Sequence, residues 1–192
     1  MRKNPERTRA RRAEIVSAAK DLFFEYGYDA TSIRMIQERV GKQVAVFYYY
    51  FESKDEVFDY AIDMFLHDYE ETLKTIADTH VNPTADLVKI LDYIQEQTCN
   101  FRSQYSETIH WSVASGINTR VLGLLKKYVR QVLEHYISAG KAVVGVMGLD
   151  ETCGVLAYAL GGSILNEDNE TYARQKEELC RLIPVMIKFH EE

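Results

Sequence analysis

Residues 41–56 read GKQVAVFYYYFESKDE, and this stretch decides how the N-terminal part of the chain folds. Five aromatic residues stand in a row from Phe47 to Phe51, a run too apolar for an ordinary surface turn, yet charged residues flank it on both sides. After the run, Ser53 and Glu56 form the capping-box pattern that begins a new helix. The aromatic run is therefore confined between Gly41 and this box.

The residues before this stretch predict two further helices. Apolar residues recur at steps of three and four over Thr8–Tyr26, and Gly27 is placed to end that helix in the left-handed conformation. Thr31 or Ser32 can cap a second, short helix that ends at Gly41. Two short helices joined by a glycine-containing turn, after a longer helix, are typical of a helix-turn-helix DNA-binding module.

In such a module the aromatic run forms the recognition helix, which packs one face on its own module and turns the other toward DNA. The spacing predicts that the packed residues are Val44, Phe47 and Phe51. The residues left to face DNA are Gln43, Ala45, Val46, Tyr48 and Tyr49.

The rest of the chain also reads as helical. A helix from Ser53 continues to about Ala77, and Asn82 with Pro83 begins the next helix, which continues to about Phe101. We expect a short helix over 106–114 that stops at Ser115-Gly116, and further helices over 119–139, 150–165 and 171–189. Pro184 should kink the last helix or end it early.

Composition supports an all-helical protein without disulfides. The 192 residues are 46% hydrophobic and 27% charged, and they include only three prolines. Three cysteines are widely spaced and odd in number, which favours a reducing cytoplasm over a disulfide framework or a zinc site. No signal-peptide pattern and no membrane-spanning apolar run stands in the sequence, so we expect a cytoplasmic protein with no membrane partner.

Charge is distributed unevenly along the chain. Residues 1–12 hold six basic residues and one acidic residue, a local charge of +5. Because the net charge is −6, the remainder of the chain carries −11. A basic arm on an acidic body indicates a polyanion as partner for the arm alone. A solvated, frayed terminus is the alternative.

The stretch AAKDLFFEYGYDATSIRMIQERVGKQVAVFYYYFESKDEVF, Ala18–Phe58, resembles the DNA-binding signature of the TetR family of bacterial transcriptional regulators. The likeness covers roughly residues 8–60, in order and with the family's spacing. It implies an all-α fold of about nine helices. A helix-turn-helix DNA-binding domain over 1–54 would be followed by a helical ligand-binding and dimerisation domain over 55–192.

The resemblance also implies roles for single residues. Thr31 would begin the second helix at the phosphate backbone, while Tyr48 and Lys54 would hold the backbone on either side of the recognition helix. Arg34 is a candidate for phosphate or a guanine edge. The complete set expected to contact DNA is Thr31, Ser32, Arg34, Gln43, Ala45, Val46, Tyr48, Tyr49 and Lys54.

Several residues depart from the family's pattern. Small polar residues usually stand where this chain has Gln43 and Val46, histidine is common at Tyr50, and alanine at Gln37. Base recognition would then rest on few hydrogen bonds, with Gln43 on adenine and with Ala45 and Val46 on thymine methyl groups. We therefore expect A/T-rich positions in the operator.

The family resemblance implies a ligand-responsive regulator that binds a palindromic operator as a homodimer. We expect repression, with activation as the alternative. A small, largely apolar, aromatic or cationic effector would release the regulator. The expected pocket residues are Phe65, Tyr69, Tyr93, Gln97, Phe101, Trp111 and Tyr128. The expected dimer interface contains Cys153, Leu156, Leu160, Leu179, Ile183 and Met186, although burial within one subunit would also explain such stripes.

Other function classes have weaker support in the sequence. We expect no enzymatic activity, no cofactor and no metal site, because the five histidines lack HExxH spacing and neither a phosphate-binding glycine loop nor a nucleophile elbow is present. The alternative is a regulator that senses metal, haem or redox state through His67, His110 or a cysteine such as Cys99.

Overall fold

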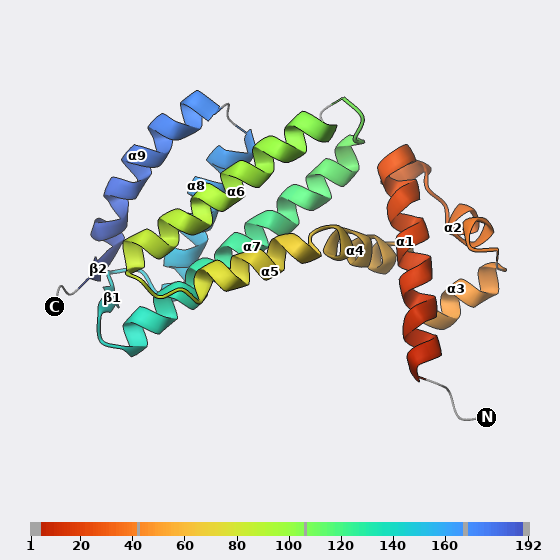
Figure 1. Cartoon of the computed structure of the whole chain (residues 1–192), viewed down its shortest axis with the longest axis horizontal. Helices are drawn as coiled ribbons and strands as arrows, with labels where there is room; N and C mark the ends of the chain where they lie inside the picture. The colour runs from red at the N-terminus through yellow and green to blue at the C-terminus, as the bar shows by residue number, and fades with distance from the viewer. Residues whose placement is uncertain (1–4, 42, 106, 167–168, 190–192) are drawn as a thin grey trace. The chain divides into compact units, whose positions relative to one another are not determined.

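The computed structural model of the chain describes residues 5–41, 43–105, 107–166 and 169–189. Nine helices and two short strands are described (Figure 1), so the prediction of an all-α fold is confirmed. In chain order they are α1 (Pro5–Ala30), α2 (Ile33–Arg39), α3 (Val44–Tyr50), α4 (Lys54–Phe65), α5 (His67–Ala77), α6 (Pro83–Tyr105), α7 (Trp111–Ser138), β1 (Ala142–Val144), α8 (Leu149–Asn166), α9 (Asn169–Met186) and β2 (Ile187–Phe189).

The chain divides into two compact units. The first contains residues 1–68 and 105–117, and the second contains residues 69–104 and 118–192. The segment 105–117 returns to the first unit long after that unit's other residues in the sequence. This division describes compactness, and the functional boundary expected between residues 54 and 55 stays a prediction.

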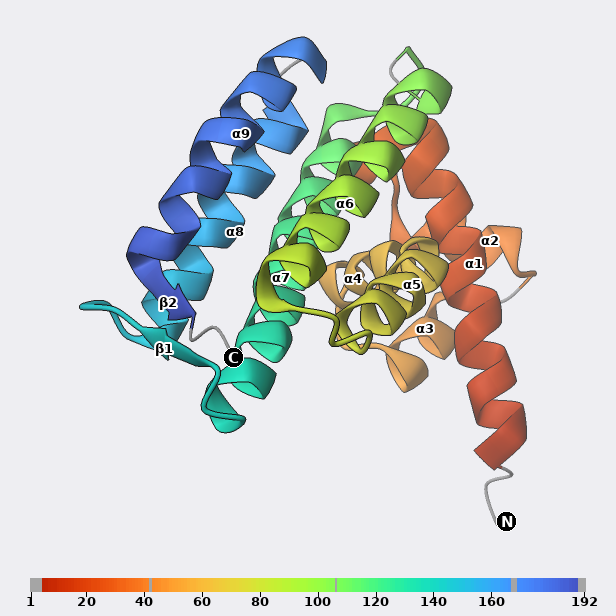
Figure 2. The same ribbon diagram turned by 60° about the vertical axis from the view of Figure 1, so that its left-hand side comes forward.

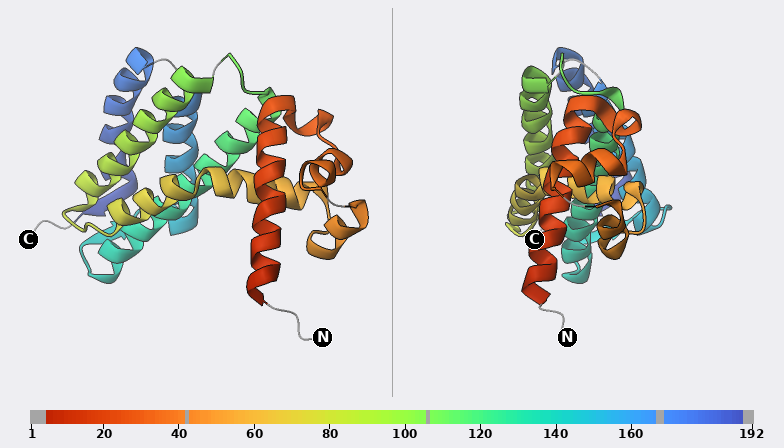
Figure 3. Two further views of the ribbon diagram at one scale, coloured as in Figure 1. Left: turned by 45° about the vertical axis from the view of Figure 1, so that its right-hand side comes forward. Right: turned by 90° about the vertical axis from the view of Figure 1, so that its right-hand side faces the viewer.

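In the first unit, α1 is the helix on which the other elements pack. Its buried face lies against α4, which crosses it, and against α2 (Figures 1 and 3). Three aromatic rings fill the crossing, because Phe58 on α4 lies 5.0 Å from Phe23 and 5.0 Å from Tyr28, measured between ring centroids. Edge-to-face aromatic contacts of this kind fix orientation as well as burying apolar area.

The local signals read from the sequence place the helix starts and stops of this unit. Gly27 has non-helical angles, φ 84° and ψ 170°, and ends the regular part of α1 as expected. The Ser53 hydroxyl accepts a hydrogen bond from the Glu56 backbone N–H at 3.1 Å. The return bond of a capping box is displaced by one residue, since the Glu56 carboxylate accepts from the backbone N–H of Glu52 at 2.7 Å.

Several predicted helix boundaries differ from those in the structure. The helix expected to continue to Ala77 is interrupted at Leu66, which closes α4 with φ −90° and ψ 5° before α5 begins. The stop expected at Ser115-Gly116 is absent, because α7 continues through both residues. A Cβ at Gly116 would lie 2.9 Å from the Phe58 ring, so glycine is there for close packing and not to end a helix.

In the second unit, α6, α7, α8 and α9 run alongside one another (Figure 2). The last helix was expected to reach Phe189, but α9 ends at Met186, two residues after Pro184. The residues that follow form an antiparallel pair of strands in which Val143 is opposite Lys188. The early end expected from Pro184 is therefore confirmed, whereas the two strands were not foreseen.

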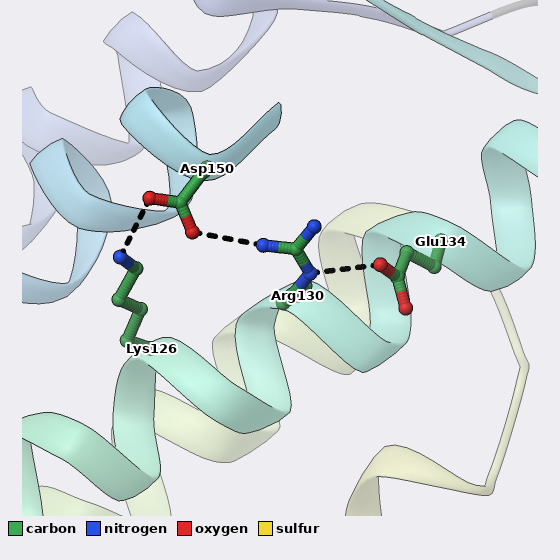
Figure 4. A network of polar contacts seen from close by, with 4 residues as sticks. All are labelled: Lys126, Arg130, Glu134 and Asp150. Carbon is green, nitrogen blue, oxygen red and sulfur yellow. Dashed lines mark hydrogen bonds and ion pairs between the residues drawn. The ribbon is translucent and has the colours of Figure 1, made fainter. Parts of the chain in front are cut away.

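Charged side chains connect α7 to the first turn of α8 (Figure 4). The Asp150 carboxylate accepts from Lys126 Nζ at 2.9 Å and from Arg130 Nη1 at 2.8 Å, and Arg130 Nε also donates to Glu134 at 2.8 Å. The hydrogen bond from Lys126 lowers the pKa of Asp150. A carboxylate in the first turn of a helix also faces the positive end of the helix dipole. The network thus favours one placement of the start of α8.

Gln37, in the core of the first unit, is a buried polar residue whose side chain has no hydrogen-bond partner in the described part of the chain. Gln37 on α2 is fully buried, and neither its amide nitrogen nor its amide oxygen has a hydrogen-bond partner among the residues that the structure describes. Burying an amide without partners costs roughly 1–3 kcal/mol on mutational scales. Gln37 therefore lowers the stability of the folded state, which an apolar side chain at this position would not do.

We expect Gln37→Leu to raise the free energy of unfolding by about 1–3 kcal/mol, because leucine removes the unpaired amide at similar volume. Urea denaturation followed by circular dichroism measures the change. Gln43→Leu, at an exposed position of the same motif, is the matched control and should leave stability nearly unchanged. A loss of stability in Gln37→Leu would contradict this account of the core.

Candidate functional site

The helix-turn-helix of the first unit consists of α2, a turn containing Gly41, and α3. Ser32 caps α2, and its hydroxyl accepts from the Met35 backbone N–H at 3.2 Å. Gly41 has φ 65°, the left-handed conformation that glycine adopts without strain. Gln43 stands in the N-cap position of α3, but its side chain makes no capping hydrogen bond. Its amide is exposed at the start of the helix, where recognition helices meet base edges.

The two faces of α3 differ from the prediction at one anchor. Phe47 and Phe51 are buried as expected, with their ring centroids 5.6 Å apart. Val44 is 40% exposed, so its assignment as a packed residue is wrong. It lies in the first turn of the helix, ahead of the buried stripe, which continues instead through the half-buried Val46 and Tyr50.

The remaining residues of α3 form its exposed face. Ala45, Tyr48 and Tyr49 are exposed together with Gln43, and both tyrosines keep more than half of their surface accessible. This face offers the Gln43 amide, two phenolic hydroxyls and small apolar groups. Such groups can bond base edges and phosphate oxygens and can contact thymine methyl groups.

Thr31 does not lie at the surface. It is 1% exposed, and its hydroxyl lies within hydrogen-bond distance of the Leu22 carbonyl at 3.1 Å and the Gly27 carbonyl at 2.8 Å. Its hydroxyl is therefore used to fasten the end of α1 to the start of α2. The structure gives this hydroxyl an internal role, and a phosphate contact of Thr31 stays a prediction.

Lys54 is likewise engaged inside the unit. Its ammonium donates to the backbone carbonyls of Tyr28 at 2.9 Å and Thr31 at 3.0 Å, and it lies 4.0 Å from the Tyr28 ring centroid. Two of its three N–H donors are thus bound to the protein, and a cation–π contact holds the third side. Lys54 thus connects α4 to the α1–α2 junction, and its expected contact with the DNA backbone stays a prediction.

Arg34 and Ser32 remain near the surface of α2. The Arg34 guanidinium pairs with Glu38 one turn later at 2.8 Å, and both side chains are well exposed. Exposed pairs of this kind contribute little to stability, so the guanidinium can exchange its carboxylate partner for a phosphate. Ser32 is exposed, but its hydroxyl is occupied as the cap of α2.

Arg12, which the sequence pattern places only in a basic arm, contacts residues at the end of α3 and in α4. Its guanidinium lies 4.7 Å from the Phe51 ring centroid and 4.9 Å from that of Tyr60, and Nη2 contacts the Glu56 carboxylate at 3.3 Å. It therefore links α1 to both sides of the turn between α3 and α4. The sequence gives no sign of these contacts, because Arg12 and Phe51 meet only in the folded chain.

The residues expected to form the ligand pocket belong to both units. Phe65 and Trp111 lie in the first unit, where Phe65 packs on Phe24 at 5.0 Å between ring centroids and Trp111 is 69% exposed. An indole so exposed is not enclosed by its own unit. The other expected residues, Tyr69, Tyr93, Gln97, Phe101 and Tyr128, lie in the second unit.

Within the second unit, two of these residues come together. The rings of Tyr69 on α5 and Tyr93 on α6 have centroids 5.3 Å apart. The Tyr69 hydroxyl is buried and, in the described ranges, has no hydrogen-bond partner, and burial raises its pKa. Tyr128 is also buried, but its hydroxyl donates to Glu70 at 3.2 Å. Among these residues, Tyr69 thus has a hydroxyl that is buried and without a partner in the described part of the chain.

The predicted dimer stripe is largely buried within one subunit. Cys153, Leu156 and Leu160 on α8 and Ile183 on α9 are each at most 5% exposed, Met186 is half-buried, and the Leu179 side chain lies outside the described residues. Intrasubunit packing therefore accounts for the four buried residues. The exposed apolar residues of these helices are Val155 and Tyr158 on α8 and Val185 on α9.

The sensor alternatives gain no support from these positions. Burial raises the pKa of the Cys153 thiol to about 11, which disfavours the reactive thiolate. Across the described parts of the chain, no three histidine, cysteine, aspartate or glutamate residues gather as a metal site would require. His110 instead contacts the Ser112 hydroxyl at 2.8 Å.

Membrane insertion has no candidate segment in the described residues, where every helix is too short or too polar to span a bilayer.

Comparison with known proteins agrees with this geometry. Residues 15–61 match the sequence model of bacterial regulatory proteins of the tetR family. The chain is 31% identical over 97 residues to the HTH-type transcriptional regulator HbdR of Aromatoleum sp., a match covering 50% of this chain and 38% of HbdR. It is 35% identical over 49 residues to the HTH-type transcriptional repressor Rv1474c of Mycobacterium tuberculosis, covering 26% of each protein. The chain thus spans less than half the length of these two curated relatives.

Solved structures extend the likeness in fold beyond the matched segment. The structure of RolR in complex with resorcinol superposes with a TM-score of 0.60 at 16% identity, covering 92% of this chain and 89% of RolR. At that identity the likeness concerns the fold alone. Residues 15–61, which contain α2, its turn and α3, thus match the bacterial regulatory proteins of the tetR family, and the rest of the chain shares the fold of RolR.

Proposed function

We propose that this protein is a ligand-responsive transcriptional regulator that represses by binding a palindromic DNA operator as a homodimer. The observation that carries the proposal is the exposed face of α3, which presents Gln43, Ala45, Tyr48 and Tyr49 beside a helix held in place by Phe47 and Phe51. Its relatives named as a transcriptional regulator and a transcriptional repressor support the same class of function.

In this proposal the groups on α3 divide into two kinds. Gln43 reads a base edge, most favourably adenine, while Ala45 and the exposed Val44 contact thymine methyl groups. The Tyr48 and Tyr49 hydroxyls and the Arg34 guanidinium bind phosphates and set the register. Lys54 acts indirectly, by holding the α1–α2 junction and the start of α4 together.

Selection of bound DNA from a random pool tests the DNA-binding part of the proposal. We expect a palindromic consensus with A/T pairs at the contacted positions. Gln43→Ala should change the preferred base at one position per half-site, since a bidentate amide–adenine pair is worth about 1–3 kcal/mol of discrimination. Tyr48→Phe should weaken all sequences alike, by roughly three- to tenfold for one lost phosphate hydrogen bond.

These two variants control each other because both replace an exposed residue of the same helix. Circular dichroism establishes that each stays folded. Absence of any selected consensus would refute the proposed function, and a uniform loss in both variants would refute the division into reading and positioning residues.

The effector in this proposal is a largely apolar, aromatic molecule that carries a hydrogen-bond acceptor. The Tyr69 hydroxyl supports this chemistry, because an unpaired buried donor gains most from a ligand acceptor. The adjacent Tyr93 ring offers an aromatic surface for stacking. RolR, which shares the fold, has been solved with the aromatic ligand resorcinol.

We expect Tyr69→Phe to stabilise the ligand-free protein by about 1–3 kcal/mol, because it removes an unpaired buried hydroxyl. Tyr136→Phe is the matched control in the same unit, since the Tyr136 hydroxyl donates to the buried Asp86 carboxylate at 2.7 Å and its loss should destabilise. Thermal unfolding measures both changes. Resorcinol and related phenols that stabilise the native protein should stabilise Tyr69→Phe less, and equal stabilisation would contradict the role of this hydroxyl.

The homodimer forms, in this proposal, through the exposed face of α8. Val155, Tyr158, Ala159 and Gly162 recur at steps of three and four residues, and a Cβ at Gly162 would contact nothing within 4 Å. A smooth apolar face of this kind permits close approach of a second helix. Val185 on α9, 74% exposed, supplies a further apolar residue. The interface thus uses the faces opposite the stripe expected from the sequence.

Light scattering tests the interface with two valines of the second unit that are both exposed, Val155 and Val81. We expect Val155→Asp to convert the dimer to a monomer at micromolar concentration, because an unpaired charge in an interface costs several kcal/mol. Val81→Asp should leave the dimer intact. A monomeric native protein, or an intact dimer in Val155→Asp, would contradict this interface.

A further inference from the structure

A groove in the first unit shares no lining residue with the exposed face of α3 or with the Tyr69–Tyr93 pair of the second unit. It has a volume of about 1000 Å³ and is lined by residues from the N-terminal half of α1, by residues from the second half of α4 and by His67 at the start of α5. These two helices pack against each other, and the groove follows their crossing. The volume matches that of ligand sites, which fall in the range of roughly 300–1000 Å³.

The body of the groove is apolar. Val16 and Ala13 contribute from α1, and Met64 and the Tyr60 ring contribute from α4. Tyr60 and Met64 are 45% and 38% exposed, a large accessible apolar area for residues that line a hollow. Burying this surface against a hydrocarbon or an aromatic ring would release about 25 cal/mol per Å².

The edge of the groove is cationic. Arg9 lines it, is exposed, and forms no ion pair or hydrogen bond within the described part of the chain. Arg12 also lines it and uses Nη2 on Glu56, which leaves other guanidinium N–H groups available. The Glu56 carboxylate accepts from the Glu52 backbone N–H and pairs with Arg12, and Asp63, which also lines the groove, is itself engaged in an interaction. An anionic group therefore finds a free guanidinium here.

We propose that this groove binds an amphipathic organic anion, whose aromatic or aliphatic body lies on Met64 and Tyr60 and whose carboxylate pairs with Arg9. The site is separate from the effector site proposed above and does not depend on DNA binding. The partner is defined by its chemistry, because the groove matches a carboxylate at one edge and an apolar body along its length.

The position of the groove connects a bound anion to the recognition helix. Arg12 forms part of the groove and at the same time stacks on Phe51, which packs on Phe47 of α3. A carboxylate that pairs with Arg9 and also attracts Arg12 away from Glu56 would loosen the contact between α1 and the α3–α4 turn. Occupancy of the groove thereby provides a second input to the DNA-binding unit, expressed through differential affinity for two arrangements.

Titration of the full-length protein with 2-naphthoate tests the site, followed by NMR of ¹³C-methyl methionine. Met64 is one of five methionines, and Met64→Leu assigns its signal. We expect 2-naphthoate to shift the Met64 methyl signal in a saturable manner. Methyl 2-naphthoate, which lacks the charge, should bind roughly five- to tenfold more weakly for loss of a charge-assisted pair, and inorganic phosphate should not shift the signal.

Arg9→Gln and Arg7→Gln form a matched pair, because both remove one exposed charge from α1 but only Arg9 lines the groove. Arg9→Gln should weaken 2-naphthoate binding roughly five- to tenfold while binding of the methyl ester stays constant, and Arg7→Gln should change neither. Tyr69→Phe should bind 2-naphthoate normally, which separates this site from the effector site. An unmoved Met64 signal, or equal losses in the two arginine variants, would overturn the proposal.

Discussion

The ammonium group of Lys54 holds together the junction on which the rest of the helix-turn-helix depends. It donates to the carbonyls of Tyr28 and Thr31, and it lies over the Tyr28 ring, so that the start of α4 is fixed to the junction of α1 and α2. Thr31 fastens the same junction from inside through its hydroxyl. The segment between these fixed points contains α3, whose placement follows from both ends being held.

The residues of α3 and its ends thus fall into two groups, those that anchor the helix and those that stay exposed. Phe47 and Phe51 anchor α3, while Gln43, Tyr48 and Tyr49 remain accessible. A helix of seven residues has little stability of its own, because nucleating a short helix is unfavourable. Tertiary contacts therefore supply the order of α3.

The sequence pattern was most informative where a local signal has a local cause. Gly27, Ser53 and Pro184 each mark a helix end through their own backbone or side-chain chemistry, and each is found at or near an end. It failed where packing decides: Leu66 interrupts a helix without any glycine or proline, and Gly116 lies inside one because the Phe58 ring leaves no room for a Cβ. Periodicity alone also cannot say which of two apolar stripes on α8 is buried in its own unit.

By itself the sequence determined the all-α class, the helix-turn-helix at 31–51 and the family resemblance, because spacing, caps and glycines act within a few residues of one another. Only the tertiary structure decided that Thr31 and Lys54 are occupied internally, that Val44 is exposed, and that the Tyr69 hydroxyl lacks a partner. Those properties depend on which groups, distant in the chain, arrive at the same place. The residue type determines which hydrogen bonds a side chain can make. Whether its donors and acceptors are available to another molecule depends on the residues around it in the folded structure.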